Sequence, residues 1–322
     1  MVVIATLGEA LLRLSAPFGE RLEDARSLDL HVGGSEANVA FALAQIGLAS
    51  SWTSVLPRNP LGRKVASTLA SGGVDLATVV WQDGGRLGTY FIELGSHPRR
   101  TDVVYDRTGS AMSLATADLF DWDQICQARL LHLSGITTAL SPGCARVVER
   151  AIVEAKSHGC RVSFDVNYRQ RLWPPADAAA SLRGIAPGLE VVICTLEDAR
   201  DLFGITGSPE DCVGAFAKLL GVPTTVLTCG ADGAVALQGE ELLRRPGYTV
   251  TTVDRIGAGD AFTAGFLAGF LEGSAAKGLE QGLLMSALKM TLHGDLFRFS
   301  SDEVEAFRQS VKPSDSGREV RR

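Results

Sequence analysis

The sequence lacks several features that define common classes of protein. Its six cysteines form no CxxC pair, which argues against a zinc site or a disulfide framework, and we expect them to be reduced and mostly buried. The five histidines are scattered without the short spacing of a metal site. No run approaches 18 uninterrupted apolar residues and the first residues carry no basic segment, so we expect neither a membrane span nor a signal peptide, and a cytoplasmic location.

Nucleotide and hydrolase motifs are also missing. There is no GxxxxGK[ST] sequence, no GxGxxG after the first predicted strand, no GxSxG and no HExxH. These absences argue against a P-loop enzyme, a dinucleotide oxidoreductase, a serine hydrolase and a zinc protease. The net charge of −6 is spread along the chain, which argues against nucleic-acid or membrane partners and favours a small-molecule partner.

The most informative stretch of the sequence runs from Asp254 to Phe270. A β-type run at residues 248–253 leads into three small residues at 257–259, and an apolar helix is predicted from Asp260 onward. Free backbone amides and the helix dipole would let this turn hold a phosphate. Asp260 at the same helix start is suited to accept the proton of an attacking hydroxyl group. The alternative is that Asp260 is an ordinary N-cap and that the glycines merely close a turn.

A second glycine-containing turn opens an earlier helix. Gly33 and Gly34 precede a segment in which Val39, Leu43 and Ile46 keep helical spacing, and Asn38 projects from the first turn of that helix. The glycine pair indicates a close approach of the backbone to a ligand. An ordinary helix start explains the spacing equally well.

The middle of the chain predicts the fold class. From Leu130 onward, short apolar runs alternate with helical patterns, which is typical of an α/β protein with a mainly parallel sheet and helices on both faces. Ligands of such sheets bind at the carboxyl ends of the strands. That rule selects residues 165–169, Glu197 and residues 228–230 as candidate rim residues. We expect one core domain over residues 1–311 and a polar tail at 312–322.

Two earlier segments, about 10–32 and 86–111, alternate in a β-type pattern and contain turn residues. We expect them to form a small β-sheet that covers the site as a lid. Open edges on such a sheet also predict a homo-oligomer that pairs through the lid.

With these motifs in hand, the sequence resembles the ribokinase-type (PfkB) carbohydrate kinases from about residue 2 to residue 311. The two signatures are Gly33 to Ala40 and Asp254 to Phe270, in the same order and separation. Within the family, three pieces most resemble 2-keto-3-deoxygluconate kinases: Tyr105–Arg107 with Ser110–Ala111, Phe164–Arg169 with Leu172–Trp173, and Leu288–Thr291 with Gly294–Asp295.

The resemblance implies an ATP- and Mg²⁺-dependent kinase that converts 2-keto-3-deoxygluconate to its 6-phosphate, and it leaves monovalent-cation activation open. It implies that Asp260 is the general base and that Gly257, Ala258 and Gly259 form an anion hole at the turn. The sugar-acid pocket would be lined by Gly34, Asn38, Tyr90, Tyr105, Arg107 and Arg169, with Asp254 holding a substrate hydroxyl. Thr228, Gly230 and Gly233 would border the nucleotide, and Glu197 would help indirectly to hold Mg²⁺. The alternatives are a kinase for fructose or a related keto sugar and a non-catalytic sugar-acid binding protein.

Charge supports the acidic substrate. Arg107 and Arg169 would give a carboxylate charge-assisted hydrogen bonds, whereas a neutral sugar would leave both guanidinium groups unpaired. Two residues depart from the family pattern: Arg255 stands where the family usually has Thr, and Cys194 stands where many members have Asn. The metal-side role of that segment therefore rests on Glu197 alone.

Overall fold

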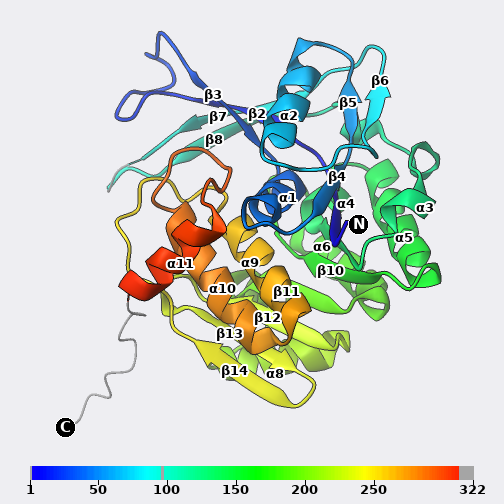
Figure 1. Cartoon of the computed structure of the whole chain (residues 1–322), viewed down its shortest axis with the longest axis vertical. Helices are drawn as coiled ribbons and strands as arrows, with labels where there is room; N and C mark the ends of the chain where they lie inside the picture. Colours follow the sequence, from blue (N-terminus) through cyan, green and yellow to red (C-terminus); the bar gives the residue numbers. More distant parts are fainter. Residues whose placement is uncertain (1, 96–97, 312–322) are drawn as a thin grey trace.

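The computed structural model describes residues 2–95 and 98–311, so the predicted tail at 312–322 lies outside the described residues. Its centre is a large twisted sheet with helices on both faces (Figure 1). The strands from β12 to β4 run parallel, and β13 and β14 are antiparallel to their neighbours. In spatial order the strands are β14 (Glu241–Arg245), β13 (Ala234–Gln238), β12 (Thr224–Thr228), β11 (Val191–Thr195), β10 (Arg161–Asp165), β9 (Leu130–Ser134), β1 (Ile4–Leu7) and β4 (Ser50–Thr53).

Two apolar cores lie on opposite faces of this sheet. One core includes Val39, Phe262 and Leu284 from the first helix layer. The other includes Val148 and Phe216 from the second layer. Burial on both faces explains why the parallel strands read as continuous apolar runs. The first layer contains α1 (Ser35–Gln45), α9 (Ala258–Glu272), α10 (Ala275–Lys289) and α11 (Ser301–Ser310), and the second contains α5 (Pro142–Ser157), α6 (Pro175–Ile185), α7 (Leu196–Phe203) and α8 (Pro209–Leu220).

Helices α9 and α10 pack with their backbones in close contact. A Cβ atom at Gly265 would lie 2.6 Å from the carbonyl oxygen of Gln281, and one at Gly269 would lie 2.7 Å from that of Lys277. These two glycines therefore mark a close-packed helix face. The packing fixes the first turn of α9 relative to the end of α10.

A second, smaller sheet is built from two separate segments of the chain. Its spatial order is β3 (Asp29–Gly33), β2 (Leu11–Ser15), β7 (Gly88–Glu93) and β8 (Asp102–Asp106). It lies beside α1 and α2 (Pro60–Ser71) (Figure 1), over a third core that includes Leu12, Phe41 and Leu69. The α/β fold with a small additional sheet is therefore confirmed, while its action as a lid stays a prediction. The remaining elements are β5 (Val55–Pro57), β6 (Val80–Gln82), α3 (Trp122–Ile125), α4 (Gly135–Ala139) and short 3₁₀ helices at Met112–Leu114, Ala117–Leu119, Ala186–Gly188 and Gly230–Asp232.

One local prediction was wrong. Residues 248–253 form no strand, because the amide of Val253 donates to the carbonyl of Met290 at 2.8 Å instead of joining a sheet. All six cysteines are free thiols, and all except the partly buried Cys229 are buried, as expected. Within residues 2–95 and 98–311, no helix is long and apolar enough to cross a membrane.

Candidate active site

The glycine turn at the start of α9 has the geometry of an anion site. Gly257 adopts a left-handed conformation with φ 82°, and a Cβ atom there would lie 2.1 Å from the carbonyl oxygen of Asp295. Only glycine fits this position without strain. The amide of Ala258 donates to the carbonyl of Arg255 at 3.2 Å. In the part of the chain that the structure describes, no hydrogen bond takes up the amides of Gly257 and Gly259, so these two, and not all three, are available to a phosphate.

Asp260 follows this turn and is held by the first turn of α1. Its Oδ1 accepts a hydrogen bond of 2.8 Å from the Ser35 hydroxyl, and its Oδ2 accepts one of 2.7 Å from Nδ2 of Asn38. Burial raises the pKa of Asp260, and the two hydrogen bonds partly offset that effect. The result is an oriented carboxylate that is more basic than an exposed one. The two glycine-containing motifs of the sequence thus meet at this carboxylate.

The side chain of Asn38 also contains an unpaired hydrogen-bond acceptor. Its side chain is 4 % exposed, and its Oδ1 atom has no hydrogen-bond partner among the described residues. Because Nδ2 is bound to Asp260, the orientation of the amide is fixed. A substrate hydroxyl is the kind of donor that would satisfy this oxygen.

A cavity of about 410 Å³ lies beside Asp260 and has the size of a small-molecule site. Of the residues predicted for the sugar pocket, Gly34, Asn38, Tyr90, Tyr105, Arg107 and Arg169 line it. It is also lined by Gly257, Gly259, Asp260, Thr228 and Arg255. The role of each of these residues stays a prediction.

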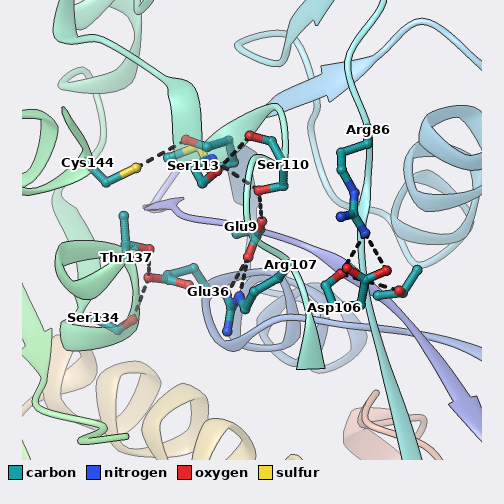
Figure 2. Close-up of polar contacts among 12 residues, drawn as sticks. Glu9, Glu36, Arg86, Asp106, Arg107, Ser110, Ser113, Ser134, Thr137 and Cys144 are labelled. Atoms are coloured by element: carbon teal, nitrogen blue, oxygen red, sulfur yellow. Dashed lines mark hydrogen bonds and ion pairs between the residues drawn. The ribbon is translucent and has the colours of Figure 1, made fainter. Parts of the chain in front are cut away.

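Arg107 is already paired with an acidic residue. It forms a buried ion pair with Glu9, which directly follows the predicted first strand, and Glu9 also accepts a hydrogen bond from Ser110 (Figure 2). The guanidinium carbon lies 5.7 Å from the centre of the Tyr105 ring. The argument that a neutral sugar would leave both arginines unpaired is therefore wrong for Arg107.

Asp254 does not reach the cavity. Its side chain is fully buried and forms an ion pair of 2.7 Å with Arg13 of β2. Its carboxylate also accepts hydrogen bonds from the amides of Ile256 (3.0 Å) and Gly294 (3.1 Å). The prediction that Asp254 holds a substrate hydroxyl is therefore wrong, because its buried carboxylate does not line the cavity and its hydrogen bonds hold the turn in place.

The second carboxylate of this cluster belongs to Asp295. It accepts hydrogen bonds from Arg13 at 2.9 Å and from the hydroxyl of Tyr90. Burial and the nearby Asp295 raise the pKa of Tyr90, so the phenol stays protonated and donates. Since Arg13 and Tyr90 come from β2 and β7, this network ties the small sheet to the glycine turn.

Acidic residues line the opposite wall at the carboxyl ends of β10 and β11. Asp165 is buried, which raises its pKa to about 8, and the nearby Asp260 adds to the effect. Asp198 faces the cavity, whereas Glu197 is exposed and lies outside it. Asp198 is therefore the acidic residue of α7 that lines the cavity, and the indirect metal-side role given to Glu197 stays a prediction.

On the predicted nucleotide side, Thr228 lines the cavity at the end of β12, but Gly230 and Gly233 do not. Both of these glycines adopt left-handed conformations in the turn between β12 and β13. Their place beside a bound nucleotide stays a prediction. Arg255 does line the cavity, beside the glycine turn.

Sequence reasoning gave no role to several residues that line the cavity. Ser35 stands in the first motif and Asn167 is one of the candidate rim residues at 165–169, and Asn167 Nδ2 donates to the Ser35 hydroxyl at 2.9 Å. Glu9 lies two residues after β1, so the rule of carboxyl strand ends could have found it. Asp295 stands with Gly294 in a stretch that resembles the family, but the pattern assigned it no function.

A turn that can bind phosphate, a buried carboxylate and a cavity bordered by a second sheet together define a small-molecule phosphotransferase. Comparison with known proteins agrees. Residues 3–297 match the family described as pfkB family carbohydrate kinase. The chain therefore belongs to the pfkB family and is a carbohydrate kinase with a ribokinase-like fold.

Individual relatives cover nearly the whole chain. It is 38% identical to a 2-dehydro-3-deoxygalactonokinase of Haloferax volcanii over 94% of this chain and 95% of the relative. It is 34% identical to a 2-dehydro-3-deoxygluconokinase of Thermoproteus tenax over 92% and 90%. The crystal structure of a 2-dehydro-3-deoxygluconokinase from Thermotoga maritima superposes with a TM-score of 0.89 at 33% identity, covering 96% of this chain and 99% of that one.

Proposed function

We propose that this carbohydrate kinase transfers the γ-phosphoryl group of ATP to the 6-hydroxyl of a 2-keto-3-deoxy sugar acid. The relatives named above support this substrate class, and they include both the gluconate and the galactonate forms. Because these epimers differ at a single hydroxyl group, the proposal covers both.

The observation that supports an acidic substrate is that Arg169 makes no ion pair among the described residues. Its guanidinium lines the cavity and donates to the carbonyl of Tyr168 at 3.1 Å. Across residues 2–95 and 98–311, no carboxylate lies within ion-pair distance of it, in contrast to Arg107. The carboxylates of Asp165, Asp198 and Asp260 attract this guanidinium only from beyond ion-pair distance. A cation on a concave surface that lacks a direct ion pair favours an anionic ligand. The carboxylate of the sugar acid would supply that anion.

The chemistry follows from the residues around Asp260. Its carboxylate takes the proton of the substrate hydroxyl while the hydroxyl oxygen forms a bond to the γ-phosphorus of ATP. The bond from that phosphorus to the bridging oxygen breaks, and ADP leaves with the electron pair. The amides of Gly257 and Gly259 stabilise the charge on the transferring group. Movement of the small sheet over the cavity would exclude water and so prevent hydrolysis of ATP.

The acidic residues fit Mg²⁺ as part of the proposed reaction. No group of three or more metal-binding side chains occurs among the described residues. Mg²⁺ instead commonly takes one or two carboxylates together with phosphate oxygens and water. Asp165 and Asp198 are the residues that would hold it, and when bound it would neutralise charge on the phosphates.

Replacement of Arg169 tests the substrate class. Arg169→Gln should raise KM for 2-keto-3-deoxygluconate about 10- to 100-fold, because this factor corresponds to the usual free energy of a charge-assisted hydrogen bond. KM for fructose should stay unchanged. The control Arg58→Gln removes an exposed arginine that is paired with Asp83 at the surface. An equal effect of Arg169→Gln on both sugars would contradict the acidic substrate and favour the neutral keto sugar.

A further inference from the structure

Lys289, the last residue of α10, is fully buried and takes no part in the chemistry described above. Its Nζ lies 3.2 Å from the carbonyl oxygen of Leu292 and 3.5 Å from that of Asp254. Within the described ranges it makes no ion pair shorter than 4 Å. The ammonium is thus solvated by backbone carbonyl groups, in the manner of a bound monovalent cation.

The two carbonyl groups come from two segments that pack against each other at the glycine turn, residues 254–257 and residues 290–295. Met290 accepts hydrogen bonds from the amides of Val253 (2.8 Å) and Asp254 (3.2 Å). Farther along, the carbonyl of Asp295 is packed against Gly257. The loop at residues 290–295 is therefore the base on which the turn at 254–257 rests. Lys289 bridges the two at the point where they first meet.

Charge gives a second reason for a cation at this position. The buried cluster contains the carboxylates of Asp254 and Asp295 and the guanidinium of Arg13, which pairs with both. Burial lowers the pKa of Lys289 and Arg13 adds to this effect, whereas the carboxylates of Asp254 and Asp295, and more weakly that of Asp260, favour the charged ammonium. With Lys289 charged, the two acids and two bases balance. Without that charge, an unpaired negative charge would lie beneath the amides that are to receive a phosphoryl group.

We infer that Lys289 is a built-in cation that holds the phosphate-binding turn in its active geometry and balances the charge beneath it. Lys289 is a positioning residue, because it acts through the turn and does not line the cavity. The inference rests on the proposed function, since the turn matters for catalysis only if it receives a phosphoryl group.

The same geometry bears on monovalent-cation activation, which the sequence left open. A metal ion at this junction would need the carbonyl oxygens of Asp254 and Leu292, and the ammonium already occupies them. The residues present therefore do not fit an exchangeable ion at this point. The kcat of the unmodified protein should be the same in potassium, sodium or tetramethylammonium buffer.

Chemical rescue separates this role from simple packing. Lys289→Ala removes the ammonium and leaves space among the carbonyl groups, so kcat should fall at least about tenfold with little change in KM for the sugar acid. Added NH₄⁺ or K⁺ should restore kcat with a saturating dependence on concentration. Lys289→Met fills the space with an uncharged chain and should show the same loss without rescue. The matched control Lys277→Ala, an exposed lysine on the same helix that is paired with Glu272, should change neither quantity.

Each outcome supports or overturns the inference. Rescue of Lys289→Ala alone supports it, and so does a rise of the Tm of Lys289→Ala with K⁺ that the unmodified protein does not show. Normal kcat in Lys289→Met, equal rescue of both variants, or activation of the unmodified protein by K⁺ would overturn it. If Lys289→Ala does not fold, the kcat of Lys289→Met and the cation-independence of the unmodified protein still decide. Failure of the unmodified protein to phosphorylate any sugar would instead contradict the proposed function, and the Tm measurement would still test the cation site.

Discussion

The Nδ2 atom of Asn38 donates a hydrogen bond of 2.7 Å to Oδ2 of Asp260, although the two residues come from opposite ends of the chain. This bond joins the first turn of α1 to the first turn of α9. It places the proposed base between a glycine turn that can hold a phosphate and the amide of Asn38, whose free Oδ1 can accept from a substrate. Two short motifs, each ambiguous alone, thus form one site.

Removal of the base should separate catalysis from binding. In Asp260→Asn the side chain keeps its size but cannot accept a proton, so kcat should fall about 10²-fold or more with KM for the sugar acid nearly unchanged. Steady-state kinetics measures both constants. A near-normal kcat in this variant would remove Asp260 from the mechanism.

Removal of one hydrogen bond to Asp260 should shift the pH dependence of the reaction. Burial raises the pKa of Asp260, and the Ser35 hydroxyl lowers it in part by stabilising the charged form. In Ser35→Ala the pKa should rise further, so the base stays protonated to higher pH. The acid limb of the kcat profile should therefore move to higher pH. An unmoved acid limb would show that a different group controls it.

The buried Glu36 should make the free energy of unfolding depend on pH. It lies in α1, buried beneath the site, and its Oε1 accepts hydrogen bonds of 2.6 Å from Ser134 and Thr137 (Figure 2). Burial raises its pKa from 4.5 to about 7. Between these values the folded chain holds a proton that the unfolded chain releases, so the free energy of unfolding should fall as pH rises through this window, by on the order of 3 kcal/mol.

The variant Glu36→Gln keeps the acceptor oxygen and cannot ionise. It should be more stable than the unmodified protein at pH 8 and should lose the slope between pH 4.5 and 7. Urea unfolding at several pH values measures this, with Glu20→Gln on the exposed loop after β2 as the control. Equal slopes for Glu36→Gln and the unmodified protein would refute the assignment.

The glycine turn should tolerate no side chain at Gly257. Gly257→Ala combines a left-handed φ of 82° with a contact of 2.1 Å to the Asp295 carbonyl. The free energy of unfolding should fall by about 2 kcal/mol or more, and kcat should fall with it. Gly184→Ala, in the last turn of α6 where a Cβ atom meets open space, should be neutral or stabilising by up to about 1 kcal/mol. Equal stabilities of the two variants would contradict the strain at the turn.

The sequence predicted what local backbone patterns encode. The two glycine motifs, the parallel sheet and the small second sheet follow from the spacing of small and apolar residues, and the structure contains them. Side-chain partners from distant segments could not be read in this way. Asp254 is paired with Arg13 of the small sheet. Arg107 is paired with Glu9, which follows the first strand. Asp198, and not Glu197, lines the cavity, because neighbouring residues of a helix face different directions.

One prediction about assembly stays open. The edge strands β3 and β8 of the small sheet expose Leu30 and Val104, at 45% and 49%. A homo-oligomer that pairs through this sheet would cover them. Light scattering of the unmodified protein and of Val104→Lys measures it. A monomer in both samples would exclude this mode of pairing.

The central claim is that the chain phosphorylates a keto sugar acid. The most direct measurement follows ADP release from ATP and Mg²⁺ with 2-keto-3-deoxygluconate, its galacto epimer, fructose, ribose and adenosine in parallel. We predict turnover with the two keto acids and little with the neutral compounds. Turnover with a neutral sugar alone would contradict the substrate class and the role of Arg169, and no turnover with any of the five compounds would contradict the proposed function itself.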